Sequence, residues 1–204
     1  LKANQYRLQV VKRRIKHKPA RSVPVNHTWG MDLTQVKLPK KQRTVLGIIE
    51  HGSRLNLALR ELPSKHSAQL LLVLCQTIRQ FGLPKTIRTD NEACFTSFFF
   101  TTALKLLGIT HQTTHLASPW ENGRIERFFG TFKNKIRQLD LSKFSNLQHE
   151  LDRFRFWYNH IRPHQNLAGY TPMEVWQNKT NRHSNKPVWV NDWQGVLTGY
   201  YFPR

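Results

Sequence analysis

The sequence is poor in cysteine and in acidic side chains, and it has no long apolar run. Its two cysteines, Cys75 and Cys94, are too few for a disulfide framework or a four-ligand zinc site. The apolar run at residues 70–74 is far shorter than the roughly 18 residues that a membrane-spanning helix needs. These absences exclude secreted, disulfide-rich and membrane-spanning classes, and they favour a reducing, intracellular compartment.

The scarcity of acid leaves a strongly basic chain. Its 204 residues hold 32 Lys and Arg against 12 Asp and Glu, a formal charge of +20. This balance predicts a polyanionic partner, and nucleic acid is favoured over a membrane surface. Residues 1–31 contain eight basic residues and no acid, which is typical of a solvated tail or of an arm on a phosphate backbone.

Proline and charge suggest where the domains begin and end. We expect a basic arm or linker over residues 1–26, a catalytic core with its following helices over 27–177, and an extension over 178–204. The extension contains a strand candidate at 188–190, which suggests a truncated small β domain. The chain begins at Leu1 rather than Met, so we expect a fragment of a longer protein.

Hydrophobic periodicity predicts an α/β domain with a mixed sheet. Three strand candidates come first, and helices then alternate with shorter strands. The expected elements are strands at 28–36, 44–49 and 55–59, a helix at 64–81, a strand at 86–89, a helix at 96–107, a strand at 109–113 and a helix from about Pro119.

The helix expected from Pro119 carries a carboxylate at the edge of its apolar stripe. Ser118 is suited to cap it, and the stripe is built from bulky apolar residues. Glu126 falls beside Asn122 and Lys133, with Arg137 just beyond. Taken alone, Glu126 is more often a surface ion-pair partner of Lys133.

Two further carboxylates change that interpretation. Asp32 interrupts a core strand, where Asp is depleted, and Asp90 ends the strand at 86–89. Ligand sites of α/β sheets lie at such strand ends. Acids clustered in a phosphate-binding protein weaken affinity unless a divalent cation lies between them and the phosphates. Asp32, Asp90 and Glu126 are therefore candidate Mg²⁺ ligands.

Four motifs together resemble the catalytic core of DDE integrases and insertion-sequence transposases. They are residues 28–34 (TWGMDLT), 88–92 (RTDNE), 118–128 (SPWENGRIERF) and 157–164 (WYNHIRPH). The 35 residues between Asp90 and Glu126 match the family's spacing. The resemblance covers roughly residues 28–177. It implies a ribonuclease-H-like fold, a five-stranded mixed sheet flanked by helices.

The same resemblance implies the chemistry. Asp32, Asp90 and Glu126 would hold two Mg²⁺ or Mn²⁺ ions for DNA 3′-end cleavage and strand transfer. The implied partners are double-stranded DNA and further copies of the chain, in the cytoplasm or nucleoid of a bacterium. The motifs of the domain that recognises the element's DNA ends in this family do not occur in the sequence. We therefore expect weak cleavage and joining activity from this chain alone. The supporting or DNA-binding residues would be Asn91, Asn122, Lys133, Arg124, Arg127 and Arg137.

Some positions depart from the family pattern or stay open. Glu92 stands where relatives often have Gly, and it either supports the site or faces solvent. Glu50 is assigned no catalytic role. Arg162 either packs on the core or contacts DNA. Two other functions remain, a ribonuclease-H-like nuclease or junction resolvase, and an inactive DNA-binding fragment.

Overall fold

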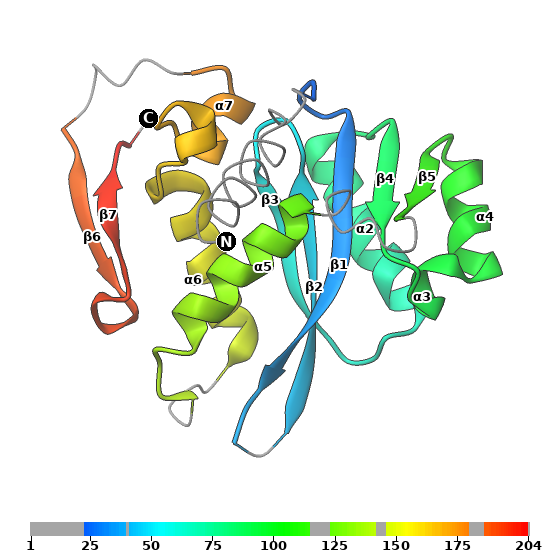
Figure 1. The fold of residues 1–204 in the computed structure, drawn as a ribbon, viewed down its shortest axis with the longest axis horizontal. Coiled ribbons are helices and arrows are strands. Elements are labelled where there is room, and N and C mark those ends of the chain that lie inside the picture. The colour runs from blue at the N-terminus through cyan, green and yellow to red at the C-terminus, as the bar shows by residue number, and fades with distance from the viewer. Residues whose placement is uncertain (1–22, 40, 115–122, 142–145, 180–185, 204) are drawn as a thin grey trace, which may run out of the picture.

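A five-stranded mixed sheet forms the centre of the molecule (Figure 1). The computed structural model describes residues 23–39, 41–114, 123–141, 146–179 and 186–203. The sheet order is β3-β2-β1-β4-β5, in which β1 pairs antiparallel with β2 and parallel with β4. This is the sheet that the sequence predicts. The strands are β1 (Thr28–Lys37), β2 (Gln42–Glu50), β3 (Asn56–Leu62), β4 (Thr86–Thr89) and β5 (Thr110–Thr113).

Helices cover both faces of the sheet, and each face has its own apolar core. On one face lie α2 (Ser67–Phe81), α3 (Ala93–Thr96) and α4 (Phe98–Leu106). On the other lie α5 (Gly123–Ile136) and α6 (Leu147–Phe156). Alternate residues of β1 feed the two cores, because successive side chains of a strand point to opposite faces.

Two helix boundaries differ from the prediction. The helix expected at 96–107 is broken, because the Ser97 side chain accepts the Phe100 N–H and starts α4 anew. The helix expected from residue 64 begins at Ser67. The expected start near Pro119 lies outside the described residues, which resume at Gly123.

Helix α5 packs very closely on β1 and β2 at a glycine. A Cβ atom on Gly47 would lie 2.7 Å from Cζ of Phe129, closer than carbon atoms approach. Gly47 pairs with Asp32 across the β1–β2 ladder, so the two residues face the same side of the sheet. The missing side chain therefore lets α5 lie close to the surface that carries Asp32.

The C-terminal part of the chain packs onto α6. A π-helical turn η3 (Trp157–Ile161), η4 (Gln165–Leu167) and α7 (Pro172–Trp176) follow α6. A hairpin of β6 (Val188–Asp192) and β7 (Leu197–Tyr201), joined by η5 (Trp193–Gly195), comes last. The strand expected at 188–190 is part of β6. The division of the chain into three regions stays a prediction.

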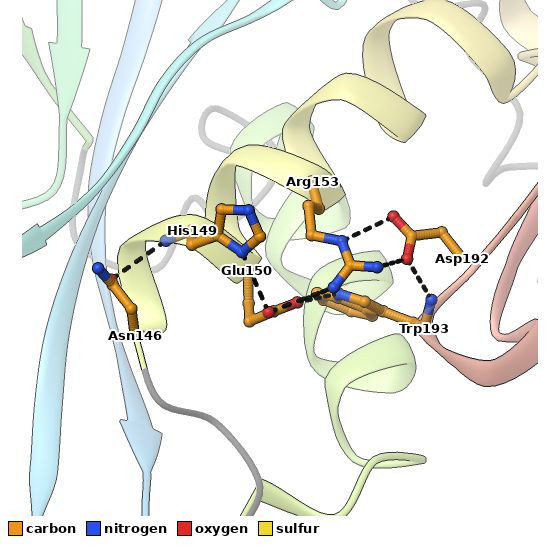
Figure 2. A network of polar contacts seen from close by, with 6 residues as sticks. All are labelled: Asn146, His149, Glu150, Arg153, Asp192 and Trp193. Atoms are coloured by element: carbon orange, nitrogen blue, oxygen red, sulfur yellow. Dashed lines mark hydrogen bonds and ion pairs between the residues drawn. The ribbon is translucent and has the colours of Figure 1, made fainter.

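A polar network fixes this hairpin to α6 (Figure 2). Arg153 forms ion pairs with both Glu150 and Asp192. Trp193 Nε1 donates to Glu150 Oε2 at 2.7 Å, and its ring stacks on Phe154 with centroids 5.8 Å apart. The hairpin therefore shares the apolar core of α5 and α6.

Candidate active site

Asp32 and Asp90 come from neighbouring parallel strands. Asp32 is half-buried within β1, and Asp90 directly follows β4. Trp29 of β1 pairs with Ile87 of β4, and the same register continued by three residues sets Asp32 beside Asp90. The Leu33 N–H donates to Oδ1 of Asp32 at 2.7 Å, and this contact orients the carboxylate.

Glu126 lies in the first turn of α5, which covers one face of the sheet. Its side chain is exposed, and α5 rests on the face of the sheet to which Asp32 belongs. Among the described residues, no ion pair joins Glu126 to Lys133. The described part of the structure therefore gives no support to the interpretation of Glu126 as an ion-pair partner of Lys133.

The charges of the acidic residues act on one another. Burial raises the pKa of Asp32 to about 7. The hydrogen bond from the Leu33 N–H acts in the opposite direction and lowers this pKa. The negative charges of Asp90, Glu92 and Glu126 add to this rise. Burial also raises the pKa of Asp90, and the charge of Glu92 contributes. The charges of Asp90, Glu92 and Glu126 thus all act on Asp32.

These acids suit a hard divalent cation. Their donors are all carboxylate oxygens, which Mg²⁺ and Mn²⁺ prefer. A cation between them would offset the repulsion that raises the pKa of Asp32. Within the part of the chain that the structure describes, no group of three or more His, Cys, Asp or Glu is already arranged to hold a metal ion. The residue types therefore fit the predicted ions, and the two-ion site itself stays a prediction.

Glu92 and Asn91 hold the segment that follows β4. The Glu92 N–H donates to Oδ1 of Asp90 at 3.0 Å, and its carboxylate pairs with Lys65 at 3.4 Å. The Asn91 amide donates to the carbonyl of Thr114 at 2.9 Å, linking this segment to the residue after β5. Glu92 therefore lies beside Asp90, where its charge acts on the site.

The basic residues predicted to support the site divide between two sides of α5. From the helical repeat, Lys133 and Arg137 lie within about 20° of Glu126, and both are exposed. Arg124 and Arg127 lie about 100° to 160° away. Arg124 donates to the carbonyl of His51 at 2.5 Å. Asn122 lies outside the described residues.

Sequence reasoning missed the structural role of Glu50. This side chain is fully buried at the end of β2 and accepts hydrogen bonds from the backbone N–H groups of Asn26, Gly52 and Ser53. It also accepts one from the Ser53 hydroxyl at 2.5 Å. Glu50 therefore stabilises the turn between β2 and β3, which also contains Arg54. A glutamate beside Gly and Ser after a strand is the sequence signal for such a turn.

Comparison with known families and relatives identifies the family of the chain. Two profiles of the integrase core domain match the chain, one over residues 24–119 and the other over residues 107–172. An uncharacterized protein of insertion element IS476 from Xanthomonas euvesicatoria is 29% identical over 196 residues, 90% of this chain and 56% of that protein. A putative integrase of Spiroplasma virus SpV1-C74 is 34% identical over 106 residues, 45% of this chain and 29% of that protein. The chain thus spans about half the length of its insertion-element relatives.

Solved structures share the fold. The HTLV-2 integrase catalytic core domain in complex with magnesium has a TM-score of 0.64 at 24% identity, over 76% of this chain and 99% of that one. A simian T-cell lymphotropic virus intasome chain reaches 0.70 at 20% identity, over 91% of this chain and 69% of that one. None of the described helices is long and apolar enough to cross a bilayer. Since the two family profiles together span residues 24–172, the chain belongs to the integrase core family, with the ribonuclease-H-like fold of DDE integrases and transposases.

Proposed function

We propose that this chain is the catalytic core of a transposase or integrase that cleaves DNA 3′ ends and transfers them to a target strand. The observation that supports the proposal is that the charges of Asp90, at a strand end, and Glu126, on a covering helix, both act on Asp32 in a central strand. The relatives in insertion elements support it. Their bacterial sources also favour action in the cytoplasm or nucleoid of a bacterium.

The three carboxylates would hold two Mg²⁺ or Mn²⁺ ions, which when bound supply charge to activate the attacking oxygen and to stabilise the leaving 3′ oxygen. The magnesium named for the HTLV-2 core favours the same class of ion. The chain's own residues position these ligands. Leu33 orients Asp32, and the backbone of Glu92 orients Asp90. Gly47 allows α5 to bring Glu126 close.

The protein's positive charge selects the substrate. With 32 basic residues against 12 acids, the chain attracts a polyanion, and Lys133 and Arg137 project from the side of α5 that carries Glu126. We assign these two residues to phosphates of the DNA near the reacting bond. Dimeric and trimeric forms of the HTLV-2 core favour a homo-oligomer on the DNA.

The test is strand joining on a supercoiled plasmid with a labelled oligonucleotide and Mn²⁺. The wild type should nick the plasmid and join the oligonucleotide to it, and Glu126→Gln should lose both activities. Asp152→Asn is the matched control, because it removes an exposed carboxylate of α6 away from the site. Joining that survives in Glu126→Gln would contradict the proposal.

Two other outcomes identify the alternatives. Nicking without any joined product, lost in Glu126→Gln, would indicate a ribonuclease-H-like nuclease or resolvase. DNA binding with neither nicking nor joining would indicate an inactive DNA-binding fragment.

A further inference from the structure

A second basic site lies on the side of α5 that faces away from Glu126. It is a pocket of about 330 Å³ between α5, the β2–β3 turn and the turn after η3. Four guanidinium groups line it, together with a phenol and an imidazole. The residues are Arg54, Arg124, Arg127, Arg162, Tyr158 and His164.

The pocket is separate from the three carboxylates. Around the α5 axis, Arg127 and Thr131 lie about 100° and 140° from Glu126, and both line the pocket. Lys133, on the other side, is not among the lining residues. One helix therefore presents one carboxylate, Glu126, to the first site and two arginines to the second.

The arginines are held in place by the fold. Arg162 lies over the rings of Trp157 and Tyr158, with centroid distances of 6.0 and 5.7 Å, and its Nη1 is 3.1 Å from Nε2 of His164. Arg54 has a positive φ of 66° and follows Ser53, which Glu50 fixes. Such preorganisation lowers the entropy that a bound ligand must remove.

Among the described lining residues are four arginines and no acid, and the charge of Glu50 acts on Arg54 and Arg124 from outside the lining. Burial raises the pKa of Tyr158 to about 12, so its hydroxyl stays neutral. Burial lowers the pKa of His164 to about 3, and the charges of Arg162 and Arg54 contribute. His164 is therefore neutral at pH 7, so the positive charge of the lining comes from its arginines.

We propose that this pocket binds a phosphate group of a DNA strand, at a distance from the reacting bond. Guanidinium groups match phosphate oxygens with paired hydrogen bonds, and several converge here. Gln165 and Asn166, both exposed at the pocket, can reach the adjoining sugar or base. That the phosphate belongs to DNA rests on the proposed function. The turn that carries Arg162 thus has a role in binding as well as in packing.

The test is the salt dependence of binding to a fluorescent DNA duplex, measured by anisotropy in EDTA so that no chemistry occurs. Arg127→Gln removes an exposed guanidinium, and Thr131→Glu adds a negative charge at a half-buried position of α5. Each should weaken binding by about tenfold at low salt and reduce the log–log salt slope by about 1. Arg79→Gln is the charge-matched control, because Arg79 is exposed on α2, across the sheet. It should leave the slope unchanged.

A second measurement separates DNA from free phosphate. At matched ionic strength, inorganic phosphate should raise the melting temperature of the wild type more than chloride does. Thr131→Glu should remove that difference. One result would overturn the assignment to DNA: phosphate raises the melting temperature of the wild type, yet Arg127→Gln and Thr131→Glu have the same salt slope as Arg79→Gln.

The outcome does not depend on catalysis. EDTA removes the divalent ions, so the duplex stays uncut, and Asp152→Asn should bind it with the wild-type slope because Asp152 is not among the lining residues. If Arg127→Gln and Thr131→Glu keep the slope of Arg79→Gln while strand joining works, the pocket proposal is wrong and the proposed function stands. If both slopes fall while no joining occurs, the pocket proposal stands and the proposed function fails.

Discussion

His51 is a buried histidine that the fold keeps neutral. Its side chain is 2% exposed, and its Nε2 has no hydrogen-bond partner among the described residues. A Cβ on Gly30 would lie 2.7 Å from this nitrogen, so the imidazole fills the space that the glycine leaves. Burial lowers the pKa of His51 to about 3, and the charges of Arg124, Arg88 and Arg54 contribute.

This histidine contributes a loss of stability in acid. Between pH 6.5 and 3 the unfolded chain binds a proton at His51 that the folded chain does not, so the contribution of His51 to stability falls as the pH falls through this window. From pH 6.5 to 5 the loss is about 2 kcal/mol for one such group. His164 contributes in the same direction, whereas Asp32, whose pKa is raised to about 7, contributes in the opposite direction. In urea unfolding measured at each pH, His51→Gln should lose about 2 kcal/mol less stability between pH 6.5 and 5 than the wild type does. His66→Gln, at an exposed histidine, should lose as much stability as the wild type does.

At the scale of elements, the contact between β2 and α5 sets the position of Glu126. Gly47→Ala places a methyl group against Phe129, and overpacking of this kind costs about 1–3 kcal/mol. Because α5 must shift, we expect strand joining to fall along with the melting temperature.

Gly130→Ala is the matched change on the same helix. Nothing lies within 4 Å of its added Cβ, and the position is exposed within α5. Alanine should stabilise the helix by about 1 kcal/mol and leave joining unchanged. Joining that falls equally in both variants would show that the close contact at Gly47 has no special role.

The elements were largely predictable from the sequence, whereas several contacts between them were not. Period-two patterns gave β1 to β3, and turn residues bounded β4 at residues 86–89. The break at Ser97 was missed because the apolar residues on both sides of it follow one continuous pattern. The Ser97 side chain nevertheless accepts the Phe100 N–H and starts a new helix there. The arginine pocket was missed because Arg54, Arg124 and Arg162 are far apart in sequence, and only the packing of α5 on the sheet brings them together.

At the scale of the whole molecule, the C-terminal hairpin is joined to the core through Trp193. This residue is 4% exposed and stacks on Phe154, whereas Trp189 on β6 is 55% exposed. Trp193→Ala should cost about 3–5 kcal/mol and lower the melting temperature of the whole chain by about 10 °C. Trp189→Ala should change it little. Calorimetry of both variants measures this, and an unshifted transition in Trp193→Ala would mean that the hairpin is independent of the core.

The sequence predicts Asp32, Asp90 and Glu126 as a set, because they are rare carboxylates in a basic chain and match the spacing of the family that the chain resembles. Their electrostatic coupling, including the effect of the charge of Glu92 on Asp32 and Asp90, required the folded structure. The central claim is that these carboxylates hold divalent ions.

Isothermal titration with Mn²⁺ tests that claim most directly, since it needs no DNA and no further domain. The wild type and Asp152→Asn should bind Mn²⁺ with equal affinity. Asp32→Asn and Glu126→Gln should each weaken binding by about tenfold or more, since each removes a charged ligand. Equal Mn²⁺ affinity in all four proteins would contradict the account.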